Sequence, residues 1–147
     1  MDSTVPQHQT ARRLIQLGIL LFLLGLLTGF AIPALENPRM GLSSHLEGTL
    51  NGMFLILAGL IWPKLHLSAT TLRIGFGPLV FGTFVNWGTT FLAALWGAGS
   101  EMMPFAGAGL VGAAWQEALI KAGLISLSLA MVAASGLLFW GMRSGRE

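Results

Sequence analysis

The chain has 147 residues, of which 54% are hydrophobic and only 10% are charged, and its mean hydropathy is +0.73. This composition is typical of a helical membrane protein and not of a water-soluble domain. The sequence contains no Cys, which excludes disulfides, thiolate nucleophiles, iron–sulfur clusters and thiolate-ligated haem. It also contains no Tyr, so no phenol can act as an acid or a ligand. A net charge of only +2, without a basic stripe, argues against nucleic-acid binding.

Four apolar runs predict an all-α bundle of four transmembrane helices. They form a single domain, residues 12–143, between a polar N-terminal tail (1–11) and a short C-terminal tail (144–147). The expected spans are 14–32, 44–62, 72–96 and 113–140. The first run is longer than the apolar core of a signal peptide, so we expect it to be retained. Its Gly25 and Gly29 have the GxxxG spacing typical of a helix-contact face, although high glycine content is common in membrane helices.

The distribution of basic residues predicts the orientation of the bundle. Four spans place both termini on one side of the membrane, and most of the Lys and Arg residues fall on that side. These are Arg12, Arg13, Lys64, Arg73, Arg143 and Arg146. By the positive-inside rule, both termini are cytoplasmic, and we expect a multi-pass protein of the bacterial inner membrane.

The stretch 43–52, at the start of the second span, carries the strongest candidate residues. His45 is the only histidine within an apolar run, and neutral imidazole is a common metal and haem ligand. Ionisable groups within membrane spans usually mark function. The alternative for His45 is an interfacial residue bonded to water or a loop. For Glu47, the spacing from Ser44 also matches a capping box, in which both side chains satisfy backbone donors at a helix start.

Asn51 lies six residues after His45, which is about 240° around a helix. The two side chains therefore cannot face one point within a single helix. If both serve one site, that site lies between subunits, with His45 from one chain and Asn51 from the next. Gly48 and Gly52, in GxxxG spacing, would allow the close approach of the two chains.

The third span carries a polar stripe, because Thr83, Asn86 and Thr90 follow one another at i, i+3 and i+7. This stripe is either a binding surface or a set of hydrogen bonds between helices. Three tryptophans form either an aromatic pocket or a set of membrane-interface anchors. They are Trp87, Trp96 and Trp115.

The fourth span begins with Glu117 and Lys121, which have the i,i+4 spacing and the order that favour an ion pair. Such a pair would lower the cost of placing two charges near the apolar region. No phosphate-binding loop, nucleophile elbow, zinc-protease motif or dinucleotide fingerprint is present. The residues alone therefore predict a membrane protein with one His-centred candidate site and specify no reaction.

The segments H-L-E-G-T-L-N-G (45–52), F-V-N-W-G (84–88) and A-W-Q-E (114–117) resemble hydroxylaminobenzene mutases. So does the spacing of W-G-A-G to M-M-P within 96–104, and the resemblance covers residues 12–143. It implies a membrane-bound isomerase that converts hydroxylaminobenzene to 2-aminophenol by intramolecular hydroxyl transfer. Such a reaction belongs to the degradation of nitroaromatic compounds.

A more distant resemblance is to styrene oxide isomerases, which are also four-span membrane enzymes. That family shares a His followed six residues later by an Asn, matching His45 and Asn51, and an Asn matching Asn86. The likeness implies a homotrimer with ferric haem b between subunits as Lewis acid, and His45 as the iron ligand. One departure concerns a catalytic Tyr one turn after the third-span Asn. Thr90 stands there, which argues against transfer of the epoxide-isomerising activity.

These resemblances and the residue chemistry lead to a set of expected roles. The expected catalytic residues are Asn51, Asn86 and Glu117. The expected substrate-binding residues are Asn51, Asn86, Thr90 and Trp87. The expected cofactor-binding residues are His45, Glu47 and Lys121, with His45 as the metal ligand. The proton released from the aromatic ring during the reaction would pass to Glu117 or to Glu47.

Three alternatives remain at this point. The chain could be an epoxide isomerase like the styrene oxide isomerases. It could be a non-catalytic b-type haem subunit, with a second axial ligand from Met53, Met131 or Met142. It could also be a small transporter or structural oligomer without haem. Product analysis and an absorption spectrum distinguish these possibilities.

Overall fold

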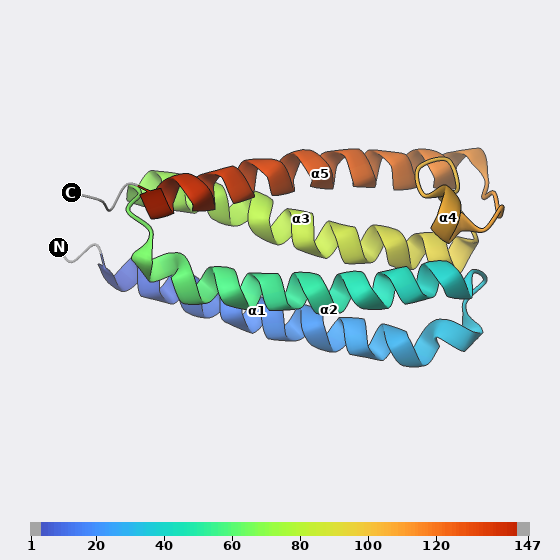
Figure 1. The fold of residues 1–147 in the computed structure, drawn as a ribbon, viewed down its shortest axis with the longest axis horizontal. Coiled ribbons are helices and arrows are strands. Elements are labelled where there is room, and N and C mark those ends of the chain that lie inside the picture. The colour runs from blue at the N-terminus through green and yellow to red at the C-terminus, as the bar shows by residue number, and fades with distance from the viewer. Residues whose placement is uncertain (1–3, 144–147) are drawn as a thin grey trace.

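The computed structural model describes residues 4–143, which fold into one bundle of four long antiparallel helices (Figure 1). The long helices are α1 (Thr4–Ala31), α2 (Pro38–Ile61), α3 (Ala69–Trp96) and α5 (Ala114–Arg143). Three short helices lie in the connections: η1 (Ile32–Ala34), η2 (Trp62–Lys64) and α4 (Pro104–Gly107). Helices α2 and α3 are the central pair, with α1 packed on α2 and α5 packed on α3. Both chain ends lie at one end of the bundle, and α4 lies at the other (Figure 1).

All four long helices are long and apolar enough to cross a membrane. Large apolar side chains are exposed on their outer faces, where lipid would cover them. Examples are Ile19, Leu27, Phe30, Leu57, Leu129 and Val132. The expected all-α, four-span architecture is therefore confirmed, and the fold is that of a multi-pass membrane protein.

The first helix begins at Thr4, well before the expected start of the membrane domain. The polar segment 1–11 is thus helical over the part that the structure describes. Gln7 explains why these polar residues can continue the helix, since its Nε2 donates to the carbonyl oxygens of Trp62 (2.7 Å) and Leu65 (3.3 Å). These bonds hold the start of α1 against the carboxyl end of α2.

The second helix begins at Pro38, with Asn37 as its N-cap. The Asn37 side chain accepts a hydrogen bond from the backbone N–H of Met40 at 3.1 Å. Asn followed by Pro at the first helical position is a recognised helix start. Ser44 therefore lies inside the helix, and the capping-box interpretation of Ser44 and Glu47 is wrong. The carboxylate of Glu47 is free for another partner.

The buried residues form two apolar clusters with a polar layer between them. The cluster near the chain ends includes Leu14, Leu21, Leu55, Trp62 and Leu79. The cluster near α4 includes Leu35, Met40, Ala93, Ala98 and Ile120. The buried polar residues between them are Thr28, Ser44, Asn51, Thr83, Thr89 and Thr90. Polar chemistry is therefore concentrated at one level of α1, α2 and α3.

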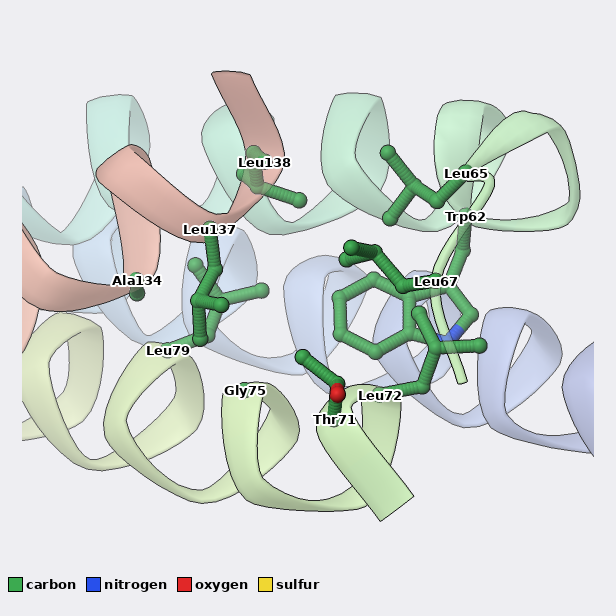
Figure 2. Close-up of a pocket in the computed structure, with 10 residues that line it drawn as sticks. All are labelled: Trp62, Leu65, Leu67, Thr71, Leu72, Gly75, Leu79, Ala134, Leu137 and Leu138. Carbon is green, nitrogen blue, oxygen red and sulfur yellow. The ribbon is translucent and has the colours of Figure 1, made fainter. Parts of the chain in front are cut away.

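A small cavity lies in the first apolar cluster, where the end of α2 meets α3 and α5 (Figure 2). Leucine side chains and the Trp62 ring line most of it. Its volume of about 10 Å³ is no more than a single water needs. A molecule with the size of an aromatic ring does not fit there, so the polar layer is the better candidate for a functional site.

The Asn37 cap provides a test of the fold. Asn37 is 1% exposed, and its Nδ2 also donates to the carbonyl oxygens of Ala106 (3.0 Å) and Gly107 (3.1 Å). Asn37→Ala removes the cap and leaves these carbonyls unpaired, so we expect a loss of about 2–4 kcal/mol in the free energy of unfolding. Ser68→Ala removes the exposed cap of α3 and should cost about 1 kcal/mol or less. Thermal unfolding in detergent, followed by circular dichroism, compares the two; equal losses would contradict the role of Asn37.

Candidate active site

A carboxylate and two amides meet between α2 and α3. Oε2 of Glu47 accepts hydrogen bonds from Nδ2 of Asn51 at 3.0 Å and from Nδ2 of Asn86 at 2.6 Å. Asn51 also donates to the backbone carbonyl of Glu47 at 2.9 Å. Glu47 and Asn51 are one turn apart and share the face of α2 that is directed at α3. We call Glu47, Asn51 and Asn86 the carboxylate–amide cluster.

This cluster offsets the cost of placing a carboxylate between apolar helices. A charged group without partners in such surroundings is strongly disfavoured, whereas hydrogen bonds to an ionised oxygen are among the stronger ones. Asn51 is 8% exposed, and Glu47 and Asn86 are half-buried. The second oxygen of Glu47, Oε1, accepts no hydrogen bond from residues 4–143. It is therefore the free acceptor of the cluster.

His45 lies on a different side of α2 and faces α1. Its Nδ1 is 2.8 Å from the carbonyl oxygen of Gly25. Because a carbonyl oxygen can only accept, Nδ1 carries the proton, and the lone pair of the neutral ring is on Nε2. The prediction that His45 and Asn51 face different directions within one chain is confirmed. The imidazole is held in the tautomer that can bind a metal through Nε2.

Glycines allow α1 and α2 to approach closely enough for this bond. A Cβ added to Gly48 would lie 2.5 Å from Cα of Gly25, and one added to Gly52 would lie 2.5 Å from the backbone N of Phe22. A Cβ added to Gly29 would lie 2.9 Å from Nδ1 of His45. Gly25 is therefore confirmed as part of a helix-contact face. The expectation that Gly48 and Gly52 allow the close approach of a neighbouring subunit is wrong, since both glycines pack against α1 of the same chain.

Trp87 lies beside the cluster and is fixed in place by two contacts. Its Nε1 donates to Oγ1 of Thr28 at 3.0 Å, and its ring stacks on Phe91 with centroids 5.7 Å apart. Trp96 and Trp115 instead pack edge to face against each other, with centroids 5.1 Å apart, so the three tryptophans do not form one pocket. Thr28 was not among the predicted site residues. Its signal is that Thr28 is the only hydroxyl residue in segment 14–32.

The threonines of the predicted polar stripe do not bridge helices. Oγ1 of Thr83 donates to the carbonyl of Leu79 at 2.9 Å, and Oγ1 of Thr90 donates to the carbonyl of Asn86 at 2.9 Å. Both side chains are buried, and both bond to their own helix, as Thr often does within a helix. Within this stripe, only the Asn86 side chain bonds across to α2.

Glu117 and Lys121 do not form the predicted ion pair. Lys121 pairs with Glu101 in the loop before α4. Both oxygens of Glu117 accept from the backbone N of Gly99, and one also accepts from Gly112 N at 2.9 Å. Glu117 lies in the first turn of α5, where free N–H groups and the helix dipole favour an acceptor. Neither residue forms a hydrogen bond or ion pair with the carboxylate–amide cluster.

Four helices that are long and apolar enough to cross a membrane, with a bonded carboxylate and a tautomer-fixed imidazole between them, are typical of a small multi-pass membrane protein with an internal candidate site. The chain matches the styrene oxide isomerase family over residues 10–143. It is 59% identical to hydroxylaminobenzene mutase HabB of Ectopseudomonas oleovorans over 134 residues, which cover 91% of the chain and 82% of that protein. It is 44% identical to hydroxylaminobenzene mutase HabA of the same organism over 125 residues, which cover 85% and 93%. No solved structure matches the chain significantly.

The chain therefore belongs to the styrene oxide isomerase family. It is an enzyme, an isomerase, and both resemblances found in its sequence are confirmed. The two non-enzyme alternatives are excluded by this assignment.

The glycine contact gives a second prediction. Gly48→Ala places a methyl group against the backbone of α1, so we expect a loss of about 1–3 kcal/mol in the free energy of unfolding. Gly136→Ala is the matched control, because no atom lies within 4 Å of its added Cβ. The control should be neutral or slightly stabilising, as Ala favours helix more than Gly does. Denaturation in mixed micelles measures both, and an equally stable Gly48→Ala protein would show that α1 and α2 do not pack as described.

Proposed function

We propose that this enzyme is a hydroxylaminobenzene mutase of the bacterial inner membrane, with both termini in the cytoplasm. The observation that carries the proposal is the 59% identity to a hydroxylaminobenzene mutase over 91% of the chain. Substrate and product are isomers: the N–O bond breaks, a C–O bond forms at the ortho carbon, and a proton moves from that carbon to nitrogen. No oxidant or reductant is needed, which agrees with a chain that lacks Cys and nucleotide-binding motifs.

We further propose that His45 holds haem b within a homo-oligomer and that this oligomer is a trimer. The residues fit this group, because the bond from Nδ1 to Gly25 leaves Nε2 as a ligand. Residues 4–143 contain no group of three or more His, Cys, Asp or Glu that could hold a bare ion, and a porphyrin needs only an axial ligand from the protein. When bound, ferric haem supplies a Lewis acid for the substrate oxygen. We assign no cofactor role to Lys121, since its ammonium group pairs with Glu101.

Glu47 is the proposed proton acceptor, and it comes from the subunit next to the one whose His45 holds the haem, because the two side chains face different sides of α2 within one chain. Its Oε1 is free to take the proton that the ortho carbon loses when the ring becomes aromatic again. Its Oε2 stays bonded to Asn51 and Asn86, which hold the carboxylate in one orientation. Glu117 is less suited to this role, because both of its oxygens already accept backbone N–H groups.

Asn86 and Trp87 shape the space beside this base. Asn86 presents its amide from α3, where it can orient the substrate nitrogen or oxygen. The stacked rings of Trp87 and Phe91 add apolar surface next to it. Such surroundings limit water, so the hydroxyl group that leaves nitrogen is kept for the neighbouring carbon and is not exchanged with solvent.

Epoxide isomerisation is the second candidate, and the family match favours it. The chain has no Tyr, and the hydroxyl group of Thr90 already donates to the carbonyls of Asn86 and Trp87. It therefore offers no phenol and no free hydroxyl at this point. Turnover of hydroxylaminobenzene and of styrene oxide by the same preparation decides between the two reactions.

The role of His45 gives the central test. His45→Ala should lose the haem absorption band and reduce the formation of 2-aminophenol to the background rate, because the only intramembrane imidazole is gone. His66→Ala, in the exposed connection between α2 and α3, should change both by less than about twofold. Absorption spectra and product chromatography measure the two effects. Full mutase turnover by haem-free His45→Ala protein would refute the proposed use of haem.

Glu47→Gln tests the base without removing the hydrogen bonds. The glutamine oxygen can still accept from Asn51 and Asn86, but it cannot take a proton at neutral pH. We expect kcat to fall by a factor of about 10²–10⁴ with an unchanged haem spectrum. Glu117→Gln is the control and should lower thermal stability while keeping kcat within about tenfold. If instead Glu117→Gln alone lost turnover, the proton would be assigned to Glu117.

A further inference from the structure

Within residues 7–143, the end of the bundle that holds the termini carries cations and no carboxylate. Its described basic residues are Arg12, Arg13, Lys64, Arg73 and Arg143. The carboxylates of this part of the chain lie elsewhere: Glu36, Glu101 and Glu117 are in the connections and the helix start near α4, and Glu47 is in the polar layer. The positive-inside rule accounts for the sign of this charge. It does not account for the placement of two of these arginines in one groove.

Arg13 of α1 and Arg73 of α3 line the same groove, although they are far apart in the sequence. Gln9, Thr10 and Phe76 complete its walls, and we call these five residues the arginine groove. Neither arginine forms an ion pair with a carboxylate of residues 4–143, where the salt bridge that occurs joins Lys121 and Glu101. Two guanidinium groups from different helices therefore face one opening.

Apolar side chains border the groove on the side of the chain ends. A second hollow shares Thr10 and Arg73 with it and is lined by Trp62, Leu67 and Leu72. Trp62 is 2% exposed, and its indole N–H has no hydrogen-bond partner within the part of the chain that the structure describes. The two arginines thus lie between this hollow and Phe76, which is about one turn farther along α3 from the chain ends. An amphipathic anion matches this arrangement.

We propose that the arginine groove binds an anionic phospholipid. The phosphate lies between Arg13 and Arg73, which can each donate two hydrogen bonds to its oxygens. An acyl chain lies along Phe76, about one turn of α3 farther from the chain ends than Arg73. Basic pockets between membrane helices on the cytoplasmic side are suited to such headgroups, because the ligand is already concentrated in the adjacent leaflet.

The experiment measures lipid retention by the purified full-length protein. Native mass spectrometry in detergent, with added phosphatidylglycerol or phosphatidylcholine, gives the bound fraction of each lipid. The wild type should prefer phosphatidylglycerol. Each arginine removed should weaken its binding about fivefold, so Arg13→Gln/Arg73→Gln should lose about 25-fold. Arg13→Lys/Arg73→Lys should keep part of the preference, because charge remains while the bidentate geometry is lost.

Arg12→Gln/Lys64→Gln is the matched control, since it removes two charges at the same end of the bundle but outside the arginine groove. It should retain binding within about threefold. Equal losses in both double variants, or no preference for phosphatidylglycerol in the wild type, would overturn the proposal. Competition by inorganic phosphate as strong as that by phosphatidylglycerol would also overturn it, in favour of a site for free anions. Circular dichroism and gel filtration establish that each variant is folded.

Discussion

The close contact between α1 and α2 at Gly25 and Gly48 is the constraint on which the rest of the site depends. It brings the Gly25 carbonyl within 2.8 Å of Nδ1 of His45, and so selects the tautomer of the imidazole. On the other side, the missing side chain of Gly48 leaves room for the Trp87 ring, since a Cβ there would lie 2.8 Å from Cδ1. A single pair of glycines therefore positions a potential ligand and an aromatic wall at the same time.

The two sides of α2 do different chemistry because a helix turns through about 100° per residue. His45 is directed at α1, whereas Glu47 and Asn51 are directed at α3 and meet Asn86. The carboxylate accepts hydrogen bonds from two amide side chains of the same chain. The imidazole has its second nitrogen without a partner among residues 4–143. Within this part of the chain, each side of α2 therefore presents one atom without a partner, Oε1 of Glu47 on one side and Nε2 of His45 on the other.

Periodicity and composition were sufficient for the four spans and for the opposite directions of His45 and Asn51, since both follow from helix geometry. Predictions based on residues close together in the sequence were wrong where groups from distant parts of the chain formed the hydrogen bonds instead. The Ser44–Glu47 cap was wrong because Asn37, next to a proline, starts the helix earlier and frees Glu47 for Asn86. The i,i+4 pair of Glu117 was wrong because backbone N–H groups of a folded loop are better partners. Such loop donors leave no pattern in the sequence.

The order of the helices in space is the order in which they are synthesised. Helix α1 packs on α2, α2 on α3, and α3 on α5, so each helix finds its main partner next to it in the chain. The connection between α1 and α2 is short, spanning residues 32–37. A nascent chain can therefore insert α1 and α2 as a hairpin and form the glycine contact between them before α5 has left the ribosome. Assembly then proceeds by adding one neighbour at a time, without waiting for a distant segment to arrive.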